Sequence, residues 1–272
     1  MTAGRTLNVV VTGGSGPSGI ATARALHEAG FGVFTVGSDG PRIEAAAMKA
    51  GTGVTPLVCD LASLPDVRTL HATVHAMLAG TAGTIDGVIH LVGGWRGAKG
   101  IPDQSDEDWD FLERSAITTL RNVTRVFYED LEASDSGRFA MVSSTAVSNP
   151  TAGVASYVAA KAAAEAWTLA MADGFRREQS GQAPFRTAAA RTAGTSDSGP
   201  APAGGPAAQP ATQHSAAVVL VVKGLVDAEM RRTSPERTFP GFTDVGELAV
   251  AAVGLFRSPA EELNGQRLLL RP

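Results

Sequence analysis

A tyrosine and a lysine stand four residues apart in the alanine-rich stretch SYVAAKAAAE, residues 156–165. On a helix, Tyr157 and Lys161 would share one face. A phenol titrates near pH 10, so acid–base chemistry at neutral pH needs a shift of about 3 pH units, roughly 4 kcal/mol. An ammonium about 4 Å away, at an effective dielectric constant of ~20, supplies about that energy. The pair is a candidate proton donor, although the same spacing occurs in helices whose tyrosine only packs.

A second candidate is the glycine-rich stretch TGGSGPSGI, residues 12–20, in which Gly14, Gly16 and Gly19 satisfy the pattern G-x-G-x-x-G. It lies between an apolar run and a helical pattern. Small residues there allow a tight turn and let backbone N–H groups and a helix N-terminus face a pyrophosphate. The placement predicts dinucleotide binding; a merely structural turn is the alternative in a chain with 31 glycines.

These residues must be positioned by elements whose strand and helix patterns alternate along the chain. We expect strands at residues 7–11, 33–36, 55–58, 87–92, 139–144, 217–222 and 267–270, and long helices at 20–29, 106–130, 156–177 and 244–256. The pattern predicts an α/β fold of the Rossmann type, a doubly wound parallel seven-stranded sheet with helices on both faces, forming one domain over residues 1–272.

Residues 179–215 interrupt the alternation with a low-complexity insertion rich in Ala, Pro and Gly. Few large apolar side chains anchor it, so we interpret it as a surface insertion, with a functional lid as the alternative. It follows a helix and precedes a strand. This order places it at the amino edge of the sheet, away from the carboxyl edge where ligands bind.

Composition excludes several classes of function. A formal net charge of −4 offers no broad cationic surface for nucleic acid, and no apolar run approaches the roughly 18 residues of a membrane span. The single cysteine, Cys59, fits a reducing compartment. We expect a cytoplasmic protein that binds neither nucleic acid nor membrane.

Together these motifs resemble the short-chain dehydrogenase/reductase family along nearly the whole chain except the insertion. The family motif T-G-x-x-x-G-x-G matches Thr12, Gly13 and Gly19, with Pro17 in place of the middle glycine. The resemblance implies that NADP or NAD is bound by Thr12, Gly13, Gly14, Ser15, Gly16, Gly19, Ile20, Ser38, Asp60, Leu61, Gly93, Tyr157 and Lys161.

The family's catalytic serine precedes the tyrosine by thirteen residues, which selects Ser144. The resemblance implies hydride transfer between a nicotinamide and a small carbonyl or alcohol substrate. Ser144 would bond the carbonyl oxygen and Tyr157 would act as general acid or base. Lys161 would lower the pKa of the phenol and hold the nicotinamide ribose.

Two departures from the family pattern support a different hypothesis. Ala116 stands where a catalytic asparagine is common, and Ala228 where a threonine usually contacts the nicotinamide amide. With Pro17, they motivate the alternative of a catalytically weak or inactive dinucleotide-binding regulatory protein. The stretch VGGW, residues 92–95, is similar to dihydropteridine reductases, which we interpret as ancestry rather than substrate.

Cofactor preference depends on the residues after the second strand. An acid there would grip the ribose 2′-OH and repel a 2′-phosphate. The sequence has Gly37 and Ser38 at that place, so we expect NADP, assisted by Arg42, in preference to NAD. Asp39 stands further along and could instead cap a helix. The family resemblance also implies a homo-oligomer, a tetramer or dimer, through helices 106–130 and 156–177.

We expect structural roles for most of the other polar and aromatic residues. His90 is expected to pack or bond at a strand end rather than catalyse. His71 and His75 have i, i+4 spacing, but no carboxylate or cysteine partner is evident near them, so no metal site is expected. Trp95 either lines substrate or packs, and residues 229–242 lie where relatives place a substrate loop.

Overall fold

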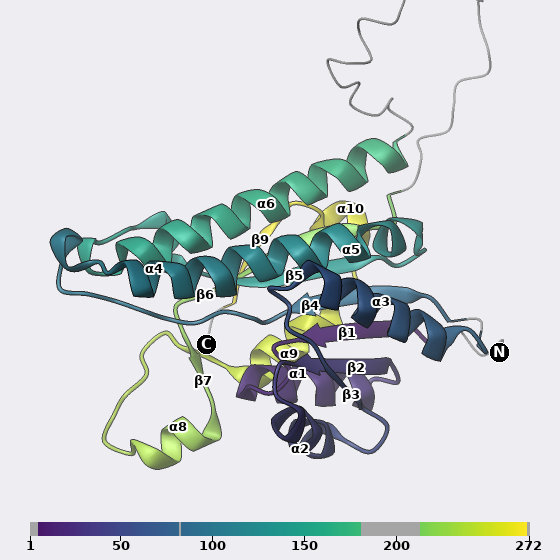
Figure 1. The fold of residues 1–272 in the computed structure, drawn as a ribbon, viewed down its shortest axis with the longest axis horizontal. Helices are drawn as coiled ribbons and strands as arrows, with labels where there is room; N and C mark the ends of the chain where they lie inside the picture. The colour runs from purple at the N-terminus through teal and green to yellow at the C-terminus, as the bar shows by residue number, and fades with distance from the viewer. Residues whose placement is uncertain (1–4, 82, 181–212, 271–272) are drawn as a thin grey trace, which may run out of the picture.

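The structure, a computed structural model, describes residues 5–81, 83–180 and 213–270. Seven parallel strands form the central sheet in the order β3-β2-β1-β4-β5-β6-β9 (Figure 1). Their bounds are β1 Asn8–Thr12, β2 Gly32–Gly37, β3 Thr55–Val58, β4 Ile85–His90, β5 Arg138–Ser144, β6 Ala216–Val222 and β9 Arg267–Leu269. The predicted doubly wound sheet is confirmed, with strand ends that differ by one or two residues.

Two layers of helices cover the sheet (Figure 1). One layer contains α3 (Leu64–Leu78), α5 (Thr119–Ala133) and α6 (Ala155–Gln179). The other contains α1 (Pro17–Glu28), α2 (Gly40–Ala50), α9 (Val245–Gly254) and α10 (Ala260–Leu263). In β1, Val10 packs into the first layer, and Val9 and Val11 pack into the second, as the two-residue period of a strand requires. Continuous apolar strands therefore have both faces covered.

Strand order reverses beside β1, whose two neighbours are β2 and β4. Chain connections leave this point in opposite directions, so a crevice opens at the carboxyl ends of the strands. Thr12 and His90 are register partners there, each the last residue of its strand. The glycine-rich segment follows Thr12 directly and so lies at the crevice.

The helix predicted at 106–130 is not continuous. α4 (Asp106–Leu112) passes through a π-helical turn, Glu113–Thr118, before α5 begins. Such turns insert an extra residue and are frequent at functional sites. The turn contains Ala116, which is buried against Leu112 and Ala160.

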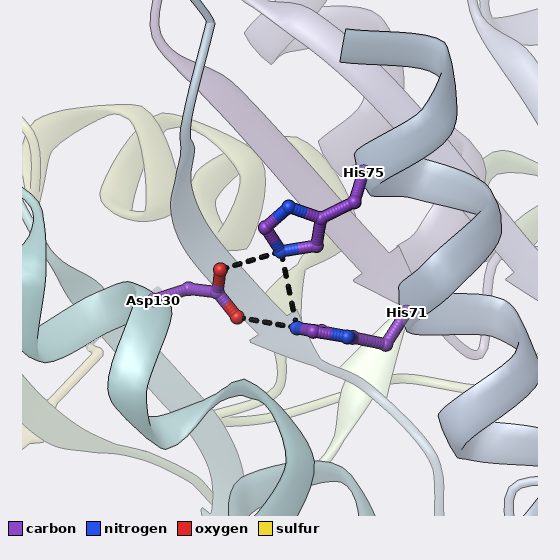
Figure 2. Close-up of side chains that lie close together, drawn as sticks. All are labelled: His71, His75 and Asp130. Atoms are coloured by element: carbon purple, nitrogen blue, oxygen red, sulfur yellow. Dashed lines mark hydrogen bonds and ion pairs between the residues drawn. The ribbon is translucent and has the colours of Figure 1, made fainter. Parts of the chain in front are cut away.

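α3 and α5 lie side by side and bring together residues that are distant in the sequence. His71 and His75 of α3 point at the carboxylate of Asp130 on α5, with Nε2–O distances of 2.7 and 2.6 Å (Figure 2). The sequence-based view that these histidines lack a nearby carboxylate was wrong, because Asp130 comes from another helix.

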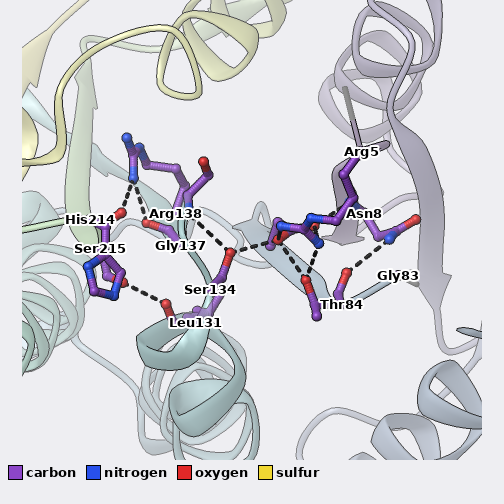
Figure 3. A network of polar contacts seen from close by, with 12 residues as sticks. Arg5, Asn8, Gly83, Thr84, Leu131, Ser134, Gly137, Arg138, His214 and Ser215 are labelled. Carbon is purple, nitrogen blue, oxygen red and sulfur yellow. Dashed lines mark hydrogen bonds and ion pairs between the residues drawn. The ribbon is translucent and has the colours of Figure 1, made fainter. Parts of the chain in front are cut away.

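A polar network holds the amino edge of the sheet, opposite the crevice (Figure 3). Buried Asp86 accepts hydrogen bonds from the Arg5 guanidinium at 2.6 Å and the Ser134 hydroxyl at 2.6 Å. The buried guanidinium of Arg138 donates to four carbonyls, among them those of Leu255 and His214. Each buried charge is thus hydrogen-bonded, as burial demands.

Most of the low-complexity segment predicted at 179–215, residues 181–212, lies outside the described residues. Its flanks are described: the Gln179 side chain bonds the hydroxyl and the backbone N–H of Ser215, just before β6. Both flanks are therefore at the amino edge of the sheet. In the described part of the chain, no helix combines the length and apolar character needed to cross a membrane.

Candidate active site

A cavity of about 680 Å³ lies over the carboxyl ends of β4, β5 and β6, and we call it the tyrosine cavity. Its wall includes residues 91–95, 142–143, 157, 161 and 222–225. α6 starts at Ala155, so its first two turns bring Tyr157 and Lys161 into this wall together. The predicted pairing on one helix face is thereby met.

Tyr157 is held in place by packing. Its ring lies against a small apolar cluster formed by Leu112, Ala116 and Ala160. Burial raises the pKa of the Tyr157 phenol above its ordinary value, and a hydrogen bond with Ser144 acts in the opposite direction. The phenol is therefore protonated at neutral pH, the form that can donate a proton.

The Lys161 side chain is buried and bonded to the backbone of β5. Its ammonium donates to the carbonyl of Val142 at 2.8 Å, and burial lowers its pKa to about 8. The expected lowering of the Tyr157 pKa by this charge is absent: desolvation is the dominant influence on the phenol. The lysine is buried and anchored to β5, although it still faces the same cavity.

Ser144 is the last residue of β5 and is buried. Its hydroxyl accepts a hydrogen bond from the N–H of Ala146 at 3.2 Å and also interacts with Tyr157. Ser143 is the serine that contributes to the cavity wall, but its hydroxyl donates to buried Glu165. Ser144 thus contacts the tyrosine, and the structure brings the predicted Ser–Tyr–Lys set together.

A second cavity, of about 590 Å³, adjoins the first and shares residues 91–93 with it; we call it the glycine-loop cavity. Seven of the thirteen predicted cofactor-binding residues line it: Gly13, Ser15, Gly16, Ser38, Asp60, Leu61 and Gly93. The two cavities thus lie next to each other at the point where strand order reverses, the place where a parallel sheet of this type binds an extended dinucleotide.

The glycine loop fits an anionic group. α1 begins at Pro17, and no side chain caps its N-terminus. The buried hydroxyl of Ser15 has no hydrogen-bond partner, although its residue lines the cavity. The first N–H groups of α1 have no partner within the helix, and together with the unpaired Ser15 hydroxyl they match the pyrophosphate of a dinucleotide. Pro17 is compatible with this loop, because a first helical residue needs no N–H bond within the helix.

Two glycines explain the loop geometry. Gly13 has φ of +75°, which favours glycine. A side-chain carbon at Gly19 would come within 2.5 Å of the Gly13 carbonyl oxygen, so α1 can approach the loop only with glycine there.

Three other predicted cofactor-binding residues lie beneath the cavity rather than in its wall. The Thr12 hydroxyl bonds Nδ1 of His90 at 2.8 Å, the Gly14 N–H donates to the carbonyl of Val36, and Ile20 packs in the core. These three residues support the glycine loop through contacts with the rest of the protein and do not line the cavity.

His90 is a buried structural residue, as expected. Its second ring nitrogen lies 3.3 Å from the Thr119 hydroxyl. Burial, and then the charge of Lys161, lower the pKa of His90 to about 3, so the ring is neutral.

The residues at the end of the glycine-loop cavity where we expect the adenosine ribose are held by local contacts. Asp39 is the N-cap of α2 and accepts from the N–H of Arg42 at 2.8 Å. Ser38, Asp39 and Arg42 all line the glycine-loop cavity. Asp60 forms an ion pair with Arg114 at 2.7 Å on the same rim.

Several cavity residues were not predicted individually. Ser18, Lys223, Arg237 and Phe242 line the tyrosine cavity. The last two belong to the expected substrate loop, which carries α8 (Ala228–Thr233) and is closed by pairing of β7 (Leu225–Val226) with β8 (Thr243–Asp244). Trp95 also lines the cavity and is 63% exposed, as an aromatic that meets a ligand would be.

A parallel sheet with this strand order, carrying its glycine loop at the point of reversal, defines a dinucleotide-binding protein of the Rossmann type. The sequence profile of the short chain dehydrogenases matches residues 7–179. The chain belongs to the short chain dehydrogenase family, a family of NAD(P)-dependent oxidoreductases.

One curated relative is nodulation protein G of Rhizobium meliloti strain 1021, 29% identical over 153 residues, which are 56% of this chain and 60% of that protein. The match therefore spans less than two thirds of the relative. Among solved structures, an actinorhodin polyketide ketoreductase with NADPH has a TM-score of 0.72 at 18% identity, covering 97% of this chain and 95% of that one. NAD+-bound xylitol dehydrogenase has a TM-score of 0.71 at 16% identity, covering 97% of both chains. At such identities the structures establish the shared fold.

Proposed function

We propose that this protein is a reductase that transfers a hydride from NADPH to a small carbonyl substrate. The observation that carries the proposal is that Tyr157, hydrogen-bonded to Ser144, and Lys161 line a cavity that shares part of its wall with the glycine-loop cavity. One end of the groove suits a pyrophosphate, and the other presents a proton donor. A dinucleotide-dependent reduction needs both.

In this proposal the bound nicotinamide supplies the hydride, and the protein supplies position and a proton. Tyr157 holds a proton on its phenol oxygen because burial raises its pKa. It gives that proton to the carbonyl oxygen of the substrate as negative charge develops there. Ser144 orients the phenol and stabilises the same oxygen. Lys161, anchored on Val142, places a positive charge at the junction of the two cavities.

Preference for NADPH is supported by the residues that face the presumed ribose. The carboxylate of Asp39 is engaged as the cap of α2, and Ser38 carries no charge that would repel a phosphate. Arg42 lines the same cavity and carries the charge that a 2′-phosphate needs.

We also propose a homo-oligomer. α4 exposes Trp109 and Phe111, and α6 exposes Trp167 and Leu169, each by more than a third of its surface. Exposed aromatic residues on neighbouring helices are typical of interfaces between subunits. Light scattering of the full chain would give a mass of two or four subunits; a monomer would contradict this proposal.

The function is tested by following oxidation of NADPH and of NADH against a panel of ketones, aldehydes and quinones. Turnover with NADPH and at least one carbonyl class is expected. Tight cofactor binding without turnover on any of these classes would instead support the regulatory alternative, which Ala116 in the π-helical turn continues to favour. Failure to bind either dinucleotide would contradict both.

A further inference from the structure

His71, His75 and Asp130 direct three ligand atoms at one point on the outer surface of the α3–α5 pair (Figure 2). The two imidazole Nε2 atoms are 3.1 Å apart, and each lies within 2.7 Å of a different oxygen of the Asp130 carboxylate. His71 is braced by an edge contact with the ring of Phe127. Nothing in the reductase chemistry uses this cluster, and none of its members lines either cavity.

Hydrogen bonds account for two of the three contacts in this cluster. Each Nε2 carries either one hydrogen or one lone pair in the ring plane. If both carry hydrogens, each donates to its own oxygen of Asp130, and the 3.1 Å contact between the two nitrogens is then not a hydrogen bond. If His71 or His75 carries a lone pair instead, that lone pair faces an anionic oxygen. No assignment of hydrogens makes all three contacts hydrogen bonds at once.

A single cation at the centre satisfies all three atoms at once. Two nitrogens bound to one ion at about 2.0–2.1 Å, at angles between a right angle and the tetrahedral angle, are about 2.9–3.4 Å apart. The observed separation of 3.1 Å between the nitrogens falls in that interval. The N–O separations of 2.7 and 2.6 Å are shorter, so the Asp130 carboxylate would move away by a few tenths of an ångström when the ion binds. Two histidines four residues apart on a helix, with a carboxylate from a second helix, form a donor set that suits zinc and related divalent transition metals.

We propose that His71, His75 and Asp130 form a binding site for a divalent transition-metal ion, with zinc as its representative. The three protein ligands leave one coordination position for water. His75 is 48% exposed at its side chain and His71 29%, so the ion has access from solvent. Asp130 lies near the carboxyl end of α5, at the edge of the sheet opposite the tyrosine cavity. The ion would therefore join α3 to α5 and stabilise the fold without entering the reaction.

The test uses the full chain without a histidine tag, stripped with a chelator and then equilibrated with Zn²⁺. Retained metal is measured by elemental analysis, affinity by calorimetry, and Co²⁺ in place of Zn²⁺ reports coordination geometry by its absorption spectrum. About one ion per chain is expected, with a low-coordinate nitrogen–oxygen spectrum for cobalt. Thermal unfolding of the wild-type chain should shift upward with Zn²⁺ concentration, as for a ligand that binds the folded state alone.

Variants H71Q, H75Q and D130N should each weaken zinc binding by at least about 10- to 100-fold, the loss known for even the outer partners of a metal. H27Q is the matched control, because His27 lies on α1 away from the cluster. It should keep wild-type affinity and the zinc-dependent shift in unfolding.

The proposal is overturned if the stripped wild-type chain takes up no zinc, or if H27Q loses as much affinity as H75Q. Comparison of stripped and loaded wild-type protein involves no substitution, so it decides the matter even where a variant folds poorly. Reductase activity is not a readout here, and the result is independent of the proposed function.

Discussion

Replacing Tyr157 by phenylalanine removes a single hydroxyl from the tyrosine cavity and leaves the ring. The ring contacts with Leu112, Ala116 and Ala160 are kept, so the variant should fold. Loss of the hydrogen bond with Ser144 costs about 0.5–1.5 kcal/mol of stability. The change thus isolates the proton donor from the packing of its side chain.

The expected loss of turnover in Y157F depends on which proton donors remain in the cavity. Without the phenol, the proton must come from water or from Ser144, whose hydroxyl also accepts from the Ala146 N–H. A positioned general acid contributes about 10²- to 10⁴-fold, or roughly 2.7–5.4 kcal/mol of the barrier. We expect Y157F to lose that factor in kcat/KM for carbonyl reduction, while its affinity for NADPH changes little.

The chain offers a matched control in its other tyrosine. The Tyr128 hydroxyl donates to Glu178 at 2.8 Å on the helical layer, outside both cavities. Y128F removes the same atom and should keep turnover within a few-fold of the wild type. Full turnover by Y157F, or an equal loss in Y128F, would refute the assignment of Tyr157 as the proton donor.

Three further predictions concern cofactor binding and the loop. R42Q should weaken NADPH binding by about 10- to 100-fold and NADH binding far less, because a charged hydrogen bond of about 1.5–3 kcal/mol to a 2′-phosphate is lost. Fluorescence titration measures both affinities. Equal effects on the two cofactors would contradict the preference for NADP. Burial lowers the pKa of Lys161 to about 8, so its positive charge is present below pH 8 and lost above it. NADPH affinity should therefore fall as the pH rises through 8. The K161M variant should bind NADPH weakly at every pH, without that step. G19A should lower the free energy of unfolding by about 1–3 kcal/mol in urea titrations, since its methyl would meet the Gly13 carbonyl oxygen at 2.5 Å, while G254A in open space on α9 should be neutral or stabilising.

Much of the fold was predictable because its signals are local. The apolar runs of β1 and β6 are short, continuous and bounded by helical patterns, which is typical of a parallel sheet buried on both faces. The spacing from Ser144 to Tyr157 to Lys161 could be read along one chain segment. A strand, a sharp turn and a helix that follow one another in sequence remain neighbours in space.

The predicted long helix 106–130 shows where local signals were insufficient. Helical periodicity runs through residues 113–118, yet the structure has a π turn there, with Ala116 buried against α6. The shape of that turn depends on contacts with a helix forty residues later. Propensity along one segment does not report such packing.

The electrostatic state of the site was decided by the tertiary structure. Sequence spacing correctly put Lys161 on the same helix face as Tyr157, and from this a lowered phenol pKa was inferred. Folding brings the carbonyl of Val142 to the ammonium and surrounds the phenol with apolar groups, so the phenol pKa rises instead. The sign of the shift depends on desolvation, which exists only once distant segments have packed.

The histidine cluster also depends partly on local sequence and partly on tertiary packing. The i, i+4 spacing of His71 and His75 is visible in the sequence, and it places two imidazoles on one face of a helix. Their carboxylate partner, Asp130, is 55 residues beyond His75 and comes into contact only because α3 and α5 pack on the same face of the sheet. Periodicity along the chain determines which side chains share a face of a helix or strand. The packing of the layers determines which faces meet, and therefore which charged side chains come into contact.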